Sequence, residues 1–266
     1  MKIYPLYEFP PNLEQLAQLL SEIEKVQPIS KSDAAALVQK LYGKRKSRSE
    51  ITIRNLRDLG VLSGMNNIML SSETQLYMDM DKDLAQLLLY YIYKQPSLFQ
   101  LCNDLFSIDN FMEIDNPVLL SIIYSMGYKS EKLATGREKI YAIKRLISCC
   151  ISDSTLILEN PFYNYKNYYE FIKVLQESYF HTSHERIGEP IPIVLLRDYV
   201  IKEHNYSIEQ FQKYLNSLYT DILLSRNISF TTANVEFAGM GYYVINNKNY
   251  YFMKLLNYII EEDTLF

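Results

Sequence analysis

The sequence predicts a mainly α-helical protein with small β-hairpins. Apolar residues recur at helical spacing over residues 12–27 and along most of the later chain, which favours amphipathic helices. Short apolar runs around glycine or asparagine turns, at residues 61–70 and 242–255, favour strands paired in hairpins. With 266 residues, 48% of them hydrophobic, the chain is long enough for one large domain or two to three small ones.

Two helices with recognisable ends are expected near the start of the chain. The first covers residues 12–27, where a proline at position 28 ends it. The second begins at Ser30, which has the spacing of a capping box with Asp33, and it closes at Gly43. A lone helix of about ten residues is marginal in water, so the second helix must pack on its neighbours.

A basic turn separates this second helix from a third. Ser47 and Glu50 again have capping-box spacing, so the third helix is expected to start there and to run to about Leu59. Two short strands, at residues 61–62 and 68–70, follow on either side of a glycine and asparagine turn. The expected order is therefore helix, helix, basic turn, helix and hairpin.

This order resembles the winged helix-turn-helix family over about residues 12–72. The resemblance is most specific in ITIRNLRDLGVL, residues 51–62, because the family commonly shows an apolar-spaced helix that ends in Leu-x-x-x-Gly-x-Leu. Further copies are expected at about residues 115–160 and 190–255. The resemblance implies tandem winged-helix-like units with small β-hairpin wings, joined by long helices.

The expected domains are a winged helix-turn-helix over residues 1–80, a helical connector plus a degenerate winged-helix-like unit over residues 81–165, and a C-terminal winged-helix-like unit over residues 166–266. The connector is expected as one long helix over residues 81–106, with a kink at Pro96. In the degenerate unit, Thr135 and Glu138 have capping-box spacing, so a helix is expected to start there. Residues 155–158 are expected to form a strand. The expected basic side of this unit consists of Lys129, Lys132, Arg137, Lys139, Lys144 and Arg145. In the C-terminal unit, a helix is expected to begin with a capping box of Ser207 and Gln210.

Positive charge is concentrated in residues 31–57, which carry eight basic and two acidic residues in a chain of net charge −4. Duplex DNA attracts such a patch through the release of condensed counterions. The resemblance implies that the third helix presents its outer side chains to DNA. We expect eight residues to contact DNA. Phosphate contacts are expected from Lys44, Arg45, Lys46 and Arg48, and base-edge contacts from Ser47, Glu50 and Arg54. Arg57 lies on the same helix face as the residues expected at base edges.

The alternative is a protein-interaction adaptor or scaffold that is built from winged helices and does not bind DNA directly. Two observations favour it: the wing at residues 63–72 contains no Lys or Arg, and the whole chain is acidic. Under either hypothesis a protein partner or a homo-oligomer is expected. The 24 Tyr and 12 Phe suit a stacking platform for single-stranded nucleic acid, but packing in the core is their expected use.

The sequence contains no recognisable catalytic or cofactor-binding motif. Three cysteines, at positions 102, 149 and 150, lack metal-type spacing and are expected as buried, reduced thiols. His181, His184 and Glu185 have a spacing that places ligands together at one helix end, although a polar linker is their expected role. We therefore expect a protein that is not an enzyme, without cofactor or small-molecule ligand; a metal-dependent nuclease would need an acidic cluster that is not recognisable here.

No run approaches about 18 consecutive apolar residues, and the first residues lack the apolar region of a signal peptide. A cytoplasmic protein without a membrane partner is expected. The expected role is that of a subunit or regulator beside an enzyme encoded elsewhere, in a multi-protein system such as genome (antiviral) defence or a mobile element.

Overall fold

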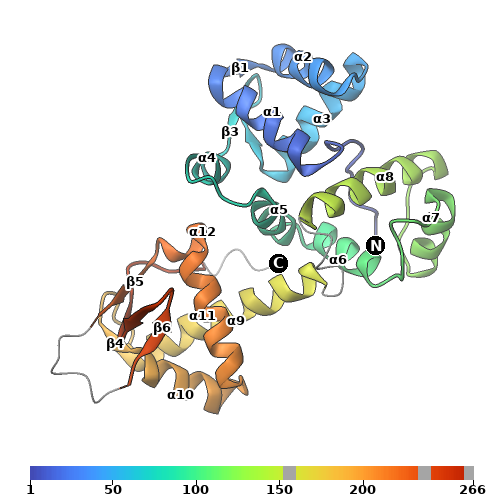
Figure 1. The fold of residues 1–266 in the computed structure, drawn as a ribbon. Helices are drawn as coiled ribbons and strands as arrows, with labels where there is room; N and C mark the ends of the chain where they lie inside the picture. The colour runs from blue at the N-terminus through green and yellow to red at the C-terminus, as the bar shows by residue number, and fades with distance from the viewer. Residues whose placement is uncertain (152–159, 233–240, 261–266) are drawn as a thin grey trace. The chain divides into compact units, whose positions relative to one another are not determined.

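A computed structural model describes residues 1–151, 160–232 and 241–260 (Figure 1). Most of these residues are helical, and the strands form small antiparallel sheets of two or three strands. The predicted mainly α class with small β-hairpins is confirmed. The chain forms two compact bodies, which we call the N-terminal body (Met1–Tyr165) and the C-terminal body (Lys166–Phe266). The domains expected over residues 1–80 and 81–165 lie together in the N-terminal body.

The first part of the N-terminal body alternates helices with very short strands. Its elements are α1 (Leu13–Val26), β1 (Ile29–Ser30), α2 (Lys31–Tyr42), α3 (Lys46–Leu59), β2 (Leu62–Ser63) and β3 (Asn67–Leu70). The strand β3 lies between β1 and β2 and is antiparallel to both, with Ile68 opposite Ile29 and Leu70 opposite Leu62. This sheet closes one end of the three-helix core, since Ile68 and Leu62 are buried.

The remaining elements of the N-terminal body are helices α4 (Ser72–Asp79), α5 (Leu84–Tyr93), α6 (Pro96–Phe106), α7 (Asn116–Ser125) and α8 (Leu133–Cys150). The single connector helix expected over residues 81–106 is wrong, because α5 and α6 are separate helices with Pro96 at the start of α6. Proline has no N–H to continue a helix, and it disfavours helical backbone at the preceding Gln95, whose ψ is 85°.

Local capping chemistry explains where several helices begin and end. The Ser30 hydroxyl accepts from the Asp33 N–H at the start of α2, and Gly43 ends α2 in the left-handed conformation, as predicted. The predicted start of α3 is wrong. The carbonyl of Arg45 accepts from the N–H groups of Arg48 and Ser49, at 3.0 and 3.1 Å, so Ser47 already lies inside the helix and does not cap it.

The capping box predicted at Thr135 is also wrong, because α8 begins two residues earlier, at Leu133. Its N-cap is Lys132, which makes no side-chain cap hydrogen bond. The helix therefore does not depend on a local polar cap, and its long apolar face, from Ile140 to Ile147, explains its stability through packing. The strand expected at residues 155–158 lies outside the described residues.

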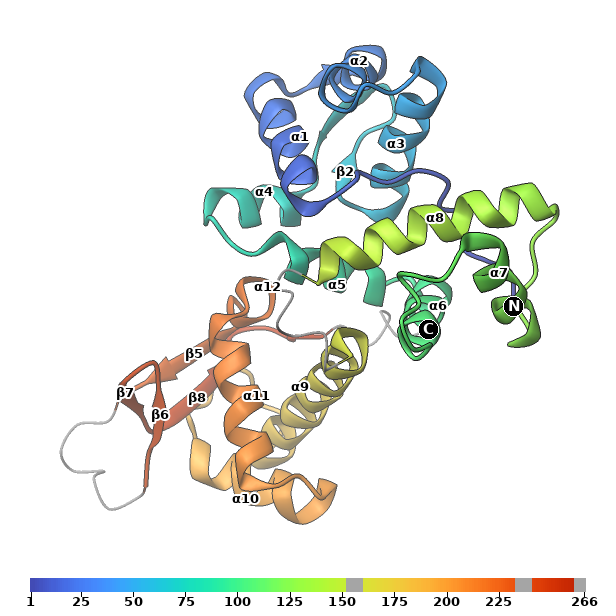
Figure 2. The same ribbon diagram turned by 45° about the vertical axis from the view of Figure 1, so that its right-hand side comes forward.

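The C-terminal body contains the element order of α1 to β3 with three additional elements. It contains most of α9 (Pro161–Ser183), then β4 (Ile191–Pro192), α10 (Ile193–His204), α11 (Ile208–Thr220), α12 (Ile222–Ser225), β5 (Ile228–Thr231), β6 (Tyr243–Ile245), β7 (Lys248–Tyr250) and β8 (Phe252–Leu255). The last strand again lies in the middle of a three-stranded sheet, in the order β4-β8-β5, and Figure 2 shows β5 and β8 side by side near α11. Helix, strand, helix, helix, strand and central strand therefore occur in this order twice in the chain, and the additional elements of the second occurrence are α12, β6 and β7.

One predicted local feature of the C-terminal body is confirmed and another is confirmed in part. Ser207 and Gln210 form a reciprocal capping box at the start of α11. The hairpin expected within residues 242–255 is present as β6 and β7, which turn at Asn246 and Asn247, both with the positive φ that two-residue hairpins require. Residues 252–255 were expected in the same hairpin, but they form β8, which pairs with β4 and β5. None of the helices within the described ranges is both long enough and apolar enough to span a bilayer.

We predict that Gly64→Ala destabilises the protein more than Gly43→Ala. Both glycines have positive φ, a conformation that costs an L-residue roughly 1–2 kcal/mol. A Cβ at Gly43 meets nothing within 4 Å, whereas a Cβ at Gly64 would lie 1.9 Å from the carbonyl oxygen of Asn67 in the hairpin. Urea unfolding of the two variants measures the difference, and equal losses would contradict the described β2–β3 turn.

We predict that the free energy of unfolding falls as the pH rises above 10, and that Tyr91→Phe reduces this fall. Burial raises the pKa of Tyr91 from 10.0 to about 12, although hydrogen bonds with Ser71 and Thr74 oppose the shift. The folded state therefore keeps a proton that the unfolded state loses, so the contribution is complete below pH 10 and is lost as the pH rises through about 12.

A shift of this size corresponds to about 2–3 kcal/mol. Urea unfolding at pH 8 and pH 11.5 measures the fall for the wild type and the variant. The matched control is Tyr163→Phe, because the side chain of Tyr163 is exposed. An identical fall in the wild type and in Tyr91→Phe would show that the pKa of Tyr91 is not raised in the folded protein.

Candidate nucleic-acid interface

Helix α3 presents a polar face to solvent and an apolar face to the core. Ile53, Leu56 and Leu59 are buried and form the apolar stripe of this helix. On the opposite face Ser47 and Arg54 are exposed, and Glu50 and Arg57 are half-buried, so the four predicted outward residues follow one side of the helix.

Three cations near this face are exposed and unpaired. Arg45, Lys46 and Arg54 form no ion pair within the ranges that the structure describes. Arg57 contacts its neighbour Asp58, with Nη2 at 3.1 Å from the carboxylate, but an exposed pair of this kind is worth only about 0–1 kcal/mol. These four side chains are therefore available to an anionic partner.

Lys44 is not available, which corrects its predicted role as a phosphate contact. Its Nζ lies 2.7 Å from Oε2 of Glu8 and donates to the carbonyl oxygen of Phe9 at 3.3 Å. Only 13% of the Lys44 side chain is exposed. Burial lowers the pKa of the Lys44 ammonium, and its hydrogen bond to Glu8 opposes that shift. Lys44 therefore stabilises the fold and does not face solvent.

Arg48 is also paired within the protein. Its Nη2 lies 2.7 Å from Glu138 of α8, and its Nη1 lies 3.9 Å from Glu8. The hydrogen bond to Glu138 raises the pKa of the guanidinium, which stays charged. About 40% of the Arg48 side chain remains exposed. Arg48 therefore takes part in the ion pairs around Glu8 and is also accessible from solvent.

We call these ion pairs the Glu8 cluster. In it three cations face two carboxylates, and its members are Glu8, Lys44, Arg48, Glu138 and Arg145. Sequence reasoning missed the cluster because its members come from three separate parts of the chain, which are the first residues, the basic turn with the start of α3, and α8. The one available signal was Glu8 itself, the one acidic residue among the first eleven, most of which are apolar or aromatic.

The Glu8 cluster holds an extended N-terminal arm, residues 1–12, against α3 and α8. Figure 2 shows the arm as the dark blue trace that passes α8 before it enters α1. The carbonyl oxygen of Glu8 accepts from Nδ2 of Asn55 in α3 at 2.7 Å, and that of Phe9 accepts from Arg145 in α8 at 3.4 Å. Ile3, Leu6 and Phe9 of the arm are fully buried. The arm therefore joins the first three helices to α8 within the N-terminal body.

Two other predicted basic residues are structural. Lys139 and Lys144 were expected on an exposed basic side of a degenerate winged-helix-like unit, but each is only 8% exposed. The ammonium of Lys139 donates to the carbonyl oxygen of Ile3, and that of Lys144 donates to the carbonyl oxygens of Met112 and Ile114. Burial lowers the pKa of Lys144. These lysines therefore satisfy buried backbone oxygens and do not form a second basic surface.

The β2–β3 hairpin, which was expected as a wing, has an apolar tip. Met65 is 79% exposed, and Met69 on β3 is also exposed. The residues from Ser63 to Leu70 include no Lys or Arg. The hairpin therefore offers flexible apolar side chains, and no positive charge, to a partner.

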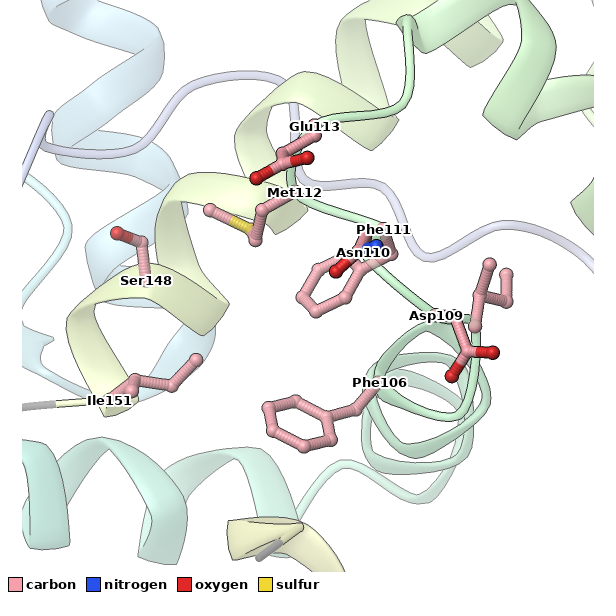
Figure 3. Close-up of a pocket in the computed structure, with 9 residues that line it drawn as sticks. Phe106, Asp109, Asn110, Phe111, Met112, Glu113, Ser148 and Ile151 are labelled. Atoms are coloured by element: carbon pink, nitrogen blue, oxygen red, sulfur yellow. The ribbon is translucent and has the colours of Figure 1, made fainter. Parts of the chain in front are cut away.

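A cavity of about 480 Å³ lies elsewhere in the N-terminal body, between the end of α6 and the end of α8 (Figure 3). Phe106 and Ile151 face one another across it. Its lining includes two carboxylates, from Asp109 and Glu113, but mainly consists of apolar side chains. No group of three histidine, cysteine or carboxylate residues in the described ranges is placed to hold a metal ion. His181 instead stacks on Tyr199, with ring centroids 4.5 Å apart.

We predict that Glu8→Gln destabilises the protein by about 3 kcal/mol, because it leaves buried cations without a counterion. The matched control, Glu138→Gln, removes a carboxylate that is 46% exposed and should cost less than about 1 kcal/mol. Urea unfolding of both variants measures the difference. A loss below 1 kcal/mol for Glu8→Gln would show that the arm is not held by this carboxylate.

Comparisons of the chain with models of protein families, with curated proteins and with solved structures found no match. An assignment of function therefore rests on the residues and the geometry of the chain itself.

Proposed function

We propose that residues 12–72 form a winged helix-turn-helix and that α3 binds double-stranded DNA. The order of α1 to β3, and the central place of β3 in its sheet, support the first part of the proposal. In helix-turn-helix proteins the second helix of the motif lies in the major groove and its first residues approach the bases. In this chain we assign that helix to α3, whose start carries the exposed cations Arg45 and Lys46.

The observation that carries the proposal is the set of unpaired cations on the outer face of α3. Arg45 and Lys46 lie at the start of the helix, and Arg54 follows about two turns later. The first turn of α3 contains no acidic residue. Cations at a helix N-terminus are unfavourable for the helix dipole by a few tenths of a kcal/mol or more, so an approaching phosphate stabilises both the charges and the helix end.

The polar residues between these cations suit the reading of bases. Ser47 is exposed and Glu50 is half-buried on the same face as Arg54. Arginine pairs with guanine through two hydrogen bonds, and glutamate accepts from the amino group of cytosine; a good bidentate pair gives roughly 1–3 kcal/mol of discrimination. We therefore assign Arg45 and Lys46 to phosphates, and Arg54 with Glu50 to base edges.

The C-terminal body supports a role within a larger assembly. Its helix α11 follows α10 as α3 follows α2 in the N-terminal body, but it exposes one cation, Lys213. The other exposed residues of α11 are Ile208, Glu209, Gln210, Gln212 and Thr220. Exposed apolar side chains, among them Tyr242 and Val244, accompany its β6–β7 hairpin. We infer that this body contacts protein, so that the chain acts as a non-enzymatic subunit or regulator of a multi-protein system.

A second function, that of an adaptor without direct DNA binding, is favoured by the wing. Met65 at its tip is the most exposed of the large apolar side chains in the described residues, and no cation accompanies it. Exposed methionines adapt to many apolar partners and occur often on protein-binding surfaces. Under this function the face of α3 would be a solvated surface and the wing would make the principal contact.

We predict that the double variant Arg45→Gln and Lys46→Gln weakens duplex binding at low salt and reduces the salt dependence. Each lost phosphate contact lowers the slope of log K against log salt by about 0.9, so the slope should fall by about 1.8. A fluorescence titration with a mixed-sequence duplex at two or more salt concentrations measures both quantities.

The matched control removes Lys82 and Lys94 in the same way, since both are exposed and lie outside α3. The control should bind with nearly the wild-type slope. Equal weakening in both double variants would mean that net charge, and not α3, determines binding. Failure of the wild type to bind any duplex at low salt would leave the adaptor function as the better account.

A further inference from the structure

We propose that Glu138 of α8 competes with the DNA backbone for Arg48 and thereby lowers the affinity of α3 for DNA. This inference rests on the proposed function, because it concerns the regulation of that same site. In the proposed exchange, Arg48 pairs with the Glu138 carboxylate in the free protein and with a phosphate in the DNA complex.

The position of Arg48 brings it near the predicted phosphate contacts. It lies in the first turn of α3, two to three residues after Lys46 and Arg45. Its guanidinium lies between two carboxylates, with Nη2 at 2.7 Å from Glu138 and Nη1 at 3.9 Å from Glu8. Since the side chain remains 40% exposed, a phosphate bound at the start of α3 can reach it without any movement of the backbone.

The two carboxylates differ in how firmly they are held. Glu8 is nearly buried, and it also contacts Lys44 at 2.7 Å and Arg145 at 3.8 Å. Glu138 is exposed, and Arg48 is the one cation recorded within 4.0 Å of it in the described part of the chain. Its side chain can therefore rotate into water at little cost, whereas Glu8 cannot leave without unfolding the arm.

An exchange of partners is favourable for Arg48. A guanidinium binds a phosphate through two parallel charge-assisted hydrogen bonds, and an exposed ion pair such as Arg48–Glu138 contributes little. The cost to DNA binding is the loss of the Arg48–Glu138 ion pair, because the guanidinium must leave Glu138 before it can pair with a phosphate. The Glu138 carboxylate then takes up a counterion, which reduces the net release of ions on binding.

The test is a duplex titration of Glu138→Gln, with Glu131→Gln as the matched control. Glu131 is an exposed carboxylate just before α8 that forms no ion pair in the described ranges, so its variant removes the same charge without releasing Arg48. We expect Glu138→Gln to bind about 3- to 10-fold more tightly at low salt, with a slope steeper by up to about 0.9. Glu131→Gln should change the affinity by less than about 2-fold, because this exposed carboxylate forms no ion pair with Arg48 in the described ranges.

The same titration in an Arg48→Gln background separates a direct exchange from a general charge effect. If Glu138 acts through Arg48, Glu138→Gln should give no further gain there. An equal gain with and without Arg48, or equal effects of the Glu131 and Glu138 variants, would overturn this inference and leave the proposed DNA binding intact. If neither the wild type nor Glu138→Gln binds duplex DNA, both the proposed function and this inference are wrong.

Discussion

The N-terminal body depends on the buried carboxylate of Glu8. A buried charge is costly unless cations and hydrogen bonds compensate it, and here Lys44 and Arg145 approach it from different elements. The arm that carries Glu8 also buries Ile3 and Phe9, so ion pairing and apolar burial hold the same segment. Through this segment the start of α3 is joined to α8. The cations that neutralise Glu8 therefore hold the arm between α3 and α8. The same cations are no longer free at the surface, which reduces the positive charge that the start of α3 exposes.

The ion pairs of Glu8 reduce the number of cations in the basic turn that are available to a partner. Residues 44–48 contain four cations, but only Arg45 and Lys46 are free for a partner. Lys44 stabilises the arm, and Arg48 is shared between the interior and the surface. The proposed DNA-binding face is consequently smaller than the sequence suggested. Within it, Arg54 and Glu50 are the residues proposed to contact base edges. The proposed regulatory contribution from Glu138 rests on its contact with Arg48 in the same cluster.

The two bodies illustrate how one arrangement of elements can carry different surfaces. Both place two helices and a short strand before a helix and a sheet whose last strand is central. The exposed residues of α3 include two cations, Lys46 and Arg54, whereas those of α11 include one, Lys213. A shared element order does not imply a shared partner, since function depends on the side chains that the elements expose. The proposed division between DNA contact and protein contact rests on this difference.

The sequence by itself determined the features that depend on near neighbours. Helical periodicity, the caps at Ser30 and Ser207 and the turn at Asn246 act over a few residues, so they could be predicted. Only the tertiary structure decided that Lys44 is buried and that Arg48 is paired. Their partners, Glu8 and Glu138, lie 36 and 90 residues away along the chain. Ion pairing and burial depend on such distant contacts, which no local pattern of residues encodes.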